Sequence, residues 1–120
     1  MSKKILIIDD DPIIVRYLEA LFQEKGYGTV VAGDGLEAYE KVKAEIPDLI
    51  TLDLQMPEEW GNRFYRRISK EKAFADIPVI VISGLAGRHL AIRKVVASFE
   101  KPFDPDKLLA VVRDTIGEAA

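Results

Sequence analysis

Four polar sites in this chain each follow an apolar run, and their side chains together could transfer a phosphoryl group. They are Asp9-Asp10 after KILII, Asp53 after DLITL, Ser83 after IPVIVI, and Lys101 in EKPF. Buried parallel strands read as short apolar runs, and open α/β sheets bind their ligands beyond the carboxyl ends of the strands. The sequence therefore predicts that these side chains meet at one edge of a parallel sheet.

The three carboxylates call for a bound cation. Carboxylates about 4 Å apart repel by roughly 4 kcal/mol per pair at an effective dielectric constant of 20. Mg²⁺, or Mn²⁺, would offset this repulsion and keep positions open for phosphate oxygens. Asp53 is the candidate nucleophile, Lys101 is a second cation, and Ser83 is a hydrogen-bond donor. The set lacks a general base, as expected for phosphoryl transfer, which depends on positioning and cations more than on proton transfer.

Length and charge restrict the possible functions. The 120 residues fit one domain, expected over 1–120. The net charge of −3 gives no general attraction to nucleic acid, and the absence of Cys excludes disulfides and thiolate metal sites. The apolar run of residues 5–8 is too short for a signal peptide. Since no run reaches the roughly 18 apolar residues of a membrane span, we expect a soluble, cytoplasmic protein without membrane contact.

Strand-like and helix-like segments alternate along the chain, which is typical of βαβ units around a parallel sheet. Strands are expected at residues 5–8, 29–32, 48–52, 79–82 and 98–100. Helices are expected at about 12–25, 36–45, 62–70 and 88–96, and a last one begins at Asp104-Pro105. Asp11 before Pro12 predicts an N-cap, and Asp104-Pro105 repeats this pattern.

Right-handed crossovers place helices on both faces of such a sheet. We therefore predict a doubly wound, flavodoxin-like α/β fold with five parallel strands in the order 2-1-3-4-5. Residues 29–32 would form an edge strand. The change of strand direction between the first and third strands would bring Asp9, Asp10 and Asp53 side by side.

These motifs resemble, over essentially the whole chain, those of the receiver domain of two-component response regulators. The matching segments are IIDDDP, LITLDLQMP with Gly61 four residues after Pro57, VIVISG, and EKPF. Each segment is a weak signal alone, but their order and spacing together are specific. The resemblance implies a signalling domain rather than an enzyme, phosphorylated on Asp53 by a histidine kinase or histidine phosphotransfer protein and controlling an unidentified downstream protein.

The resemblance also implies roles for the other site residues. Asp10 and Asp53 would hold Mg²⁺ together with the backbone carbonyl of Gln55, and Asp9 would join mainly through water. Ser83 and Lys101 would contact the bound phosphoryl group. The peptide bond from Lys101 to Pro102 would be cis, which proline permits at low cost.

The chain departs from the family pattern near its C-terminal third. Ser98 stands three residues before the lysine, where receivers usually carry Tyr or Phe, and Phe99 should face the opposite side of its strand. The interval from Ser83 to Lys101 (101 − 83 = 18 residues) is about one helical turn, roughly four residues, shorter than in the family. We expect a shortened or irregular fourth helix, and a signal carried by order and disorder of residues 84–98 instead of an aromatic switch.

Three other functions compete with this interpretation. A haloacid-dehalogenase-like phosphatase also uses an Asp after its first strand, Mg²⁺ and a Lys, and Asp9-x-Asp11 is similar to its opening motif. Against a phosphatase, this chain is short and has no cap domain, and the phosphatase interpretation gives Asp53 no role. A flavin-binding module needs a phosphate loop after the first strand, where three acids would repel phosphate. A receiver-like binding module that is never phosphorylated stays open because of Ser98.

Overall fold

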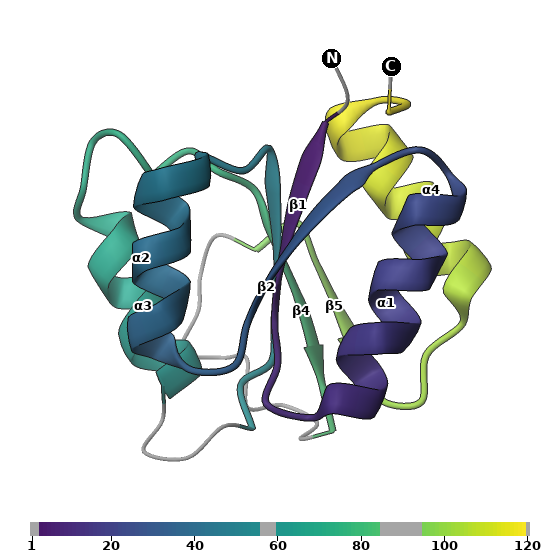
Figure 1. Cartoon of the computed structure of the whole chain (residues 1–120), viewed down its shortest axis with the longest axis horizontal. Coiled ribbons are helices and arrows are strands. Elements are labelled where there is room, and N and C mark those ends of the chain that lie inside the picture. The colour runs from purple at the N-terminus through teal and green to yellow at the C-terminus, as the bar shows by residue number, and fades with distance from the viewer. Residues whose placement is uncertain (1–2, 56–59, 85–94, 120) are drawn as a thin grey trace.

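A computed structural model describes residues 3–55, 60–84 and 95–119. One parallel sheet lies between two layers of helices (Figure 1). Its strands are β1 (Lys4–Ile8), β2 (Gly28–Ala32), β3 (Leu49–Leu52), β4 (Val79–Ser83) and β5 (Ala97–Glu100). The described helices are α1 (Pro12–Glu24), α2 (Gly35–Glu45), α3 (Trp60–Ser69) and α4 (Pro105–Ile116). The order β2-β1-β3-β4-β5 confirms the predicted doubly wound sheet, with β2 at an edge.

The central strands are apolar on both faces because helices cover both faces. In β1, Ile5 and Ile7 point to one side and Leu6 and Ile8 to the other, and all four side chains are buried. Helices α1 and α4 cover one face, and α2 and α3 cover the other (Figure 1). The sheet is thereby a rigid support whose loops can carry a site.

The predicted helix starts at Asp11 and Asp104 are confirmed. The Asp11 carboxylate accepts a hydrogen bond of 2.9 Å from the N–H of Ile13, and Asp104 caps α4 in the same way. Helix α2 begins one residue earlier than predicted, at Gly35 after the cap Asp34.

Helical spacing in the sequence predicts that Leu36 shares one apolar stripe with Tyr39 and Val42; this prediction is wrong for Leu36, because its side chain is 60% exposed. The inward face of α2 consists instead of Ala38, Tyr39 and Val42, which are spaced at one and four residues and face the sheet together. At about 100° per residue, Leu36 lies roughly 110° around the helix from the middle of this face, so its spacing of three residues from Tyr39 does not bring it to the sheet.

The predicted fourth helix, residues 88–96, lies mostly outside the described residues. Val95 and Val96 are described and are not helical, and β5 begins directly after them. Within β5, Ser98 is exposed, whereas Phe99 packs partly buried against the core beneath α1 and α4. The opposite orientation of these two side chains is therefore confirmed. Among the helices of the described residues, none has the length and apolar character that crossing a bilayer requires.

Candidate functional site

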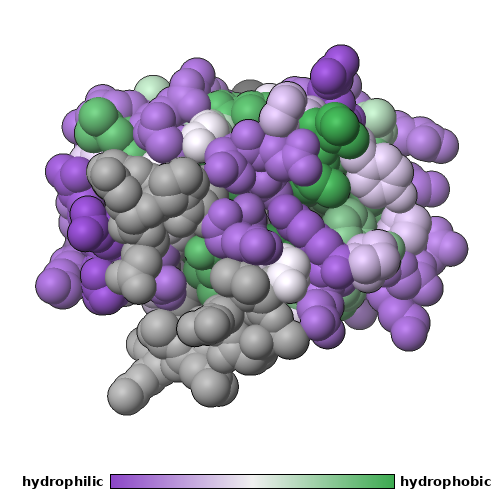
Figure 2. Space-filling view, turned by 90° about the horizontal axis from the view of Figure 1, so that it is seen from below, coloured by the Kyte–Doolittle hydropathy of each residue, from purple (hydrophilic) through white to green (hydrophobic). Residues whose placement is uncertain are grey.

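The predicted site residues all lie at the carboxyl ends of the strands, at the lower edge of the sheet in Figure 1. Figure 2 looks onto this edge, where hydrophilic residues lie across the centre of the described surface. Backbone hydrogen bonds continue the sheet ladder past the strand ends, from the Asp53 N–H to Ile8 O (3.0 Å) and from the Lys101 N–H to Ser83 O (2.9 Å). Residues far apart in sequence are thus held by the sheet itself.

Three carboxylates form the centre of this edge. Asp9, Asp10 and Asp53 each offer an oxygen, and these oxygens all lie within 4.8 Å of one another. Asp9 and Asp53 are only 3% exposed, whereas Asp10 is exposed at the rim. The sequence prediction that the first and third strands bring these acids together is confirmed.

The same local turn orients both buried carboxylates. The Asp9 Oδ1 accepts the N–H of Asp11 at 3.0 Å, and the Asp53 Oδ1 accepts the N–H of Gln55 at 2.9 Å. Each is an Asx turn, in which the side chain holds the backbone two residues ahead. The second oxygen of each carboxylate points to Lys101. Each acid is therefore held through one oxygen while the other remains available for ionic contacts.

Lys101 lies between the two buried acids. Its Nζ is 2.8 Å from Asp9 Oδ2 and 3.6 Å from Asp53 Oδ2. Burial by itself lowers the pKa of Lys101, but the hydrogen bond to Asp9 and the charges of Asp53, Asp9 and Asp11 outweigh it, so the pKa is raised above its ordinary value. The lysine is therefore a permanent cation in the site. The sequence did not predict that its shortest contact would be Asp9.

Burial raises the pKa of Asp53 above the ordinary range of an aspartate. The charges of Asp9 and Asp10 raise it further, whereas the hydrogen bond from Gln55 and the charge of Lys101 lower it. The ionised carboxylate of Asp53 is thus held at high energy by its surroundings. An additional cation beside the carboxylate would lower the energy of its ionised form.

The charges of the site suit one divalent cation. Among the described residues, the three carboxylates, when ionised, and the ammonium group of Lys101 leave two uncompensated negative charges at the cluster. All side-chain donors at the cluster are carboxylate oxygens, the ligand type that hard cations such as Mg²⁺ prefer, and opposite ligands in an octahedral Mg²⁺ site are about 4 Å apart. Oxygens within 4.8 Å of one another approach that spacing. The donor set and the spacing therefore fit Mg²⁺.

Ser83 and Gln55 lie at the same edge of the sheet as the acids. Ser83 ends β4 and is 3% exposed, and it is paired in register with Glu100, the residue before Lys101. The exposed side chain of Gln55 reaches toward Gly84, because its Oε1 lies 2.7 Å from the place that a Cβ on that glycine would occupy. The roles of the Ser83 hydroxyl and the Gln55 carbonyl stay predictions. The peptide bond from Lys101 to Pro102 is cis, as the resemblance implied.

Gly61 is a functional residue whose role sequence reasoning missed. A Cβ at this position would lie 2.5 Å from Asp53 O and 3.1 Å from the Cα of Leu54. Real Cβ atoms do not approach backbone so closely, so glycine is required where the first turn of α3 packs on the Asp53 backbone. The signal was present in the sequence, since Gly61 follows the LDLQMP segment, but the sequence alone did not show what it contacts.

With this geometry established, comparisons with known proteins identify the family. The model of the response regulator receiver domain matches residues 5–113. The chain belongs to this family. Receiver domains are signalling domains that interact with histidine kinases or phosphotransfer proteins and with downstream effectors. The family match does not favour the phosphatase alternative.

Individual relatives agree with this assignment of the receiver domain. Protein Rrf1 of Nitratidesulfovibrio vulgaris is 39% identical over 112 residues, which cover 93% of this chain and 81% of that protein. The polar-differentiation response regulator DivK of Brucella ovis is 28% identical over 99% of this chain and 100% of its own length. A receiver domain of a sensor histidine kinase from Pseudomonas aeruginosa, solved with a magnesium ion in its active-site cleft, shares the fold with a TM-score of 0.86 at 24% identity, covering 98% of this chain and 100% of that one.

Proposed function

We propose that Asp53 accepts a phosphoryl group, with Mg²⁺ bound by Asp9, Asp10 and Asp53, and that this controls a downstream protein. The observation that carries the proposal is the meeting of three carboxylates within 4.8 Å, with Lys101 in contact with two of them. We further propose that residues 1–120 form a single receiver domain that acts in the cytoplasm as a signalling module rather than an enzyme.

The donor would be the phosphohistidine of a histidine kinase or phosphotransfer protein. An Asp53 carboxylate oxygen attacks phosphorus, the P–O bond forms as the P–N bond breaks, and the imidazole nitrogen keeps the bonding electrons and takes a proton from water. Lys101 is placed to contact a phosphoryl oxygen, because it already contacts Asp53 Oδ2 at 3.6 Å. The Ser83 hydroxyl would donate a hydrogen bond from the neighbouring strand end.

The acidic side chains of the site would bind the metal ion. Asp10 and Asp53, with the backbone carbonyl of Gln55, would hold Mg²⁺ directly, and Asp9 would hold it mainly through water, since the Asp9 carboxylate already engages Lys101 and the N–H of Asp11. When bound, Mg²⁺ supplies positive charge to the acids and to the phosphoryl oxygens. Exposure of Asp10 leaves one side of the site open to a donor.

The test is phosphorylation by a small donor. The protein is incubated with acetyl phosphate and Mg²⁺, and its intact mass is measured. We expect one added phosphoryl group on the native chain and none on Asp53→Asn. Asp76→Asn is the matched control, because Asp76 is exposed and distant from the acid cluster, and this variant should be labelled normally.

Two results would overturn the proposal. Equal labelling of Asp53→Asn would place the phosphoryl group on another residue. Absence of labelling on the native chain, in protein that circular dichroism shows to be folded, would favour a receiver-like binding module that is never phosphorylated.

A further inference from the structure

The outward face of α3 and the residue directly after the helix carry four cations. The basic stripe consists of Arg63, Arg66 and Arg67 of α3 and of Lys70, which directly follows the last helical residue, Ser69. These positions follow the spacing i, i+3, i+4 and i+7, so they share one face of about 100°. Phe64 and Ile68, on the opposite side of the same segment, are buried in the core. The chain as a whole has a charge of −3, so the stripe is a local reversal of the overall charge.

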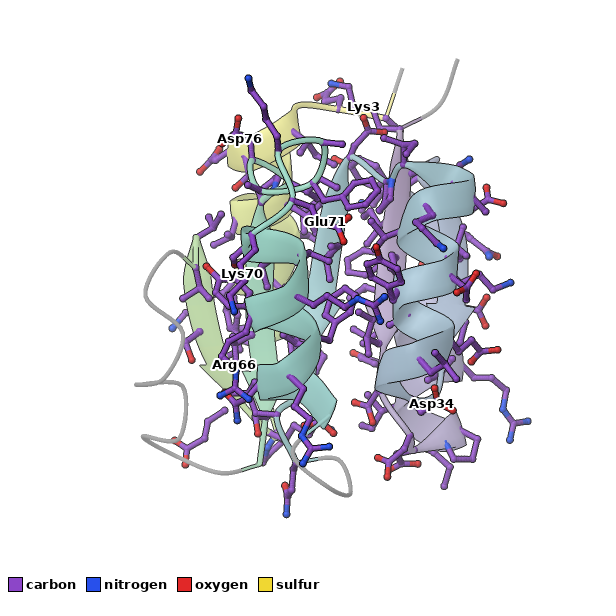
Figure 3. The ribbon with its side chains drawn as sticks, turned by 90° about the vertical axis from the view of Figure 1, so that its left-hand side faces the viewer. Lys3, Asp34, Arg66, Lys70, Glu71 and Asp76 are labelled. Carbon is purple, nitrogen blue, oxygen red and sulfur yellow. The ribbon has the colours of Figure 1, made fainter. Side chains whose placement is uncertain are left out.

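The fold uses only part of this stripe. The Arg67 guanidinium lies 3.5 Å from the centre of the Tyr39 ring, and the Tyr39 hydroxyl donates to Glu71. Arg66 and Lys70 are exposed and form no ion pair within the described part of the chain. Figure 3 shows Arg66 and Lys70 on the side of α3 turned away from α2, whereas Glu71 points into the space between the two helices.

The stripe does not serve helix stability. Like charges at i, i+3 and i, i+4 destabilise a helix by about as much as opposite charges at this spacing stabilise it. Two such pairs lie within α3, Arg63 with Arg66 and Arg63 with Arg67, and Lys70 directly after the helix adds the same spacings to Arg66 and Arg67. The helix dipole favours cations in the last turn of α3, but Arg63 lies in the first half of the helix and gains nothing from it. A binding role would account for an arrangement that the helix alone disfavours.

We propose that the basic stripe of α3 is the docking surface for an acidic protein segment. The stripe spans seven residues, or about 10 Å along the helix axis. Carboxylates on one face of a partner helix repeat at the same intervals and could oppose the exposed cations of the stripe, above all Arg66 and Lys70. The stripe lies outside the acid cluster, so this proposal does not depend on phosphorylation of Asp53.

Charge complementarity favours a short acidic protein segment over nucleic acid. The first turn of α3 packs through Gly61 on the Asp53 backbone, so the stripe ends close to the three acids of the site. A long polyanion that continued beyond the helix would meet those acids and the net charge of −3. A partner no longer than the stripe avoids this repulsion.

The experiment uses the unmodified full chain labelled with ¹⁵N at low salt. The probe is a synthetic helical peptide with Glu at i, i+3, i+4 and i+7, compared with the same peptide carrying Gln and with a duplex DNA oligonucleotide. We expect the Glu peptide to shift amide resonances of α3 selectively, with an affinity that falls as salt is added. The Gln peptide should bind at least roughly tenfold more weakly, since each exposed ion pair contributes modestly and four are lost.

Charge reversals identify the surface. The double variant Arg66→Glu with Lys70→Glu should weaken binding of the Glu peptide roughly tenfold or more, because two attractions become repulsions. The control, Arg16→Glu with Lys107→Glu, makes the same change of charge at exposed positions of α1 and α4 and should bind within about twofold of the native chain. Circular dichroism checks that both variants fold.

Three outcomes would overturn the proposal. They are absence of binding by the Glu peptide, equal weakening by both double variants, and tighter binding of the oligonucleotide than of the peptide at α3. Because the protein is not phosphorylated in this experiment, its failure would leave the proposed role of Asp53 untouched.

Discussion

Replacing Asp53 by Asn should stabilise the metal-free protein at neutral pH while abolishing phosphorylation. Asn has the shape of Asp, and its Oδ1 can still accept the N–H of Gln55, which lies 2.9 Å from that oxygen in the native chain. The substitution therefore removes a charge with little change in packing. It removes the repulsion from Asp9 and Asp10 and also the attraction to Lys101.

The expected magnitude follows from these distances. At 4.8 Å and an effective dielectric constant of 20, each repulsion is about 3.5 kcal/mol, so the two pairs with Asp9 and Asp10 give about 7 kcal/mol. The attraction to Lys101 at 3.6 Å is about 4.5 kcal/mol. The difference predicts that Asp53→Asn raises the free energy of unfolding by about 2 kcal/mol, or roughly 8 °C in Tm for a chain of this size.

Urea unfolding in EDTA at several pH values would measure this effect. The raised pKa of Asp53 means that the folded state binds its proton more tightly than the unfolded state. The stabilising contribution of this proton is complete below pH about 4, the ordinary aspartate value, and is lost as pH rises through the folded pKa. The advantage of Asp53→Asn should therefore be small at low pH and grow toward pH 7.

Added Mg²⁺ should reduce or reverse the difference in unfolding free energy between Asp53→Asn and the native chain, because only the native chain keeps Asp53 as a metal ligand. Asp76→Asn, the exposed control, should leave the unfolding free energy within about 0.5 kcal/mol. Equal stability of native chain and Asp53→Asn at pH 7, or a difference independent of pH, would refute the electrostatic reasoning.

Three further substitutions probe the rest of the site. Lys101→Met should lower the unfolding free energy in EDTA by about 3–5 kcal/mol, because it leaves the buried Asp9 without its cation; unchanged urea midpoints would contradict this. Gly61→Ala should cost about 1–3 kcal/mol and slow labelling by acetyl phosphate, because its Cβ would lie 2.5 Å from the acceptor's carbonyl oxygen. Gly33→Ala, whose Cβ would meet nothing closer than 3.9 Å, should be nearly neutral. Asp10→Asn should abolish Mg²⁺ affinity in calorimetric titration, and retained affinity would mean that the ligand assignment is wrong.

The altered β5 makes the transmission of the signal a separate question. Ser98 is exposed and Phe99 packs beneath α1 and α4, so no aromatic side chain of β5 faces the side where the family places its switch. The predicted route through residues 84–98 lies largely outside the described residues. Amide exchange of this segment with and without a phosphoryl mimic tests the prediction, and identical exchange would count against it.

The class of fold and the meeting of the three acids could be predicted from the amino-acid sequence. Short apolar runs alternating with helical stripes allow few arrangements other than a parallel sheet covered on both faces. Because the carboxyl ends of such strands share one edge, an acid placed directly after the first or third run must reach that edge. The caps at Asp11 and Asp104 were also readable, since the signal lies within two adjacent residues.

Which of these residues touch one another could not be predicted from the sequence, because it depends on tertiary packing. Three such features depend on packing between segments distant in sequence. Lys101 contacts Asp9 more closely than Asp53. Gly61 must lack a side chain because it lies on the backbone of Asp53, and Leu36 faces solvent. Periodicity within one segment gives the direction of a side chain only to within a part of a helical turn. Contact distances of 2.8 Å or 3.6 Å are finer than this, because they depend on how all the strands and helices pack together.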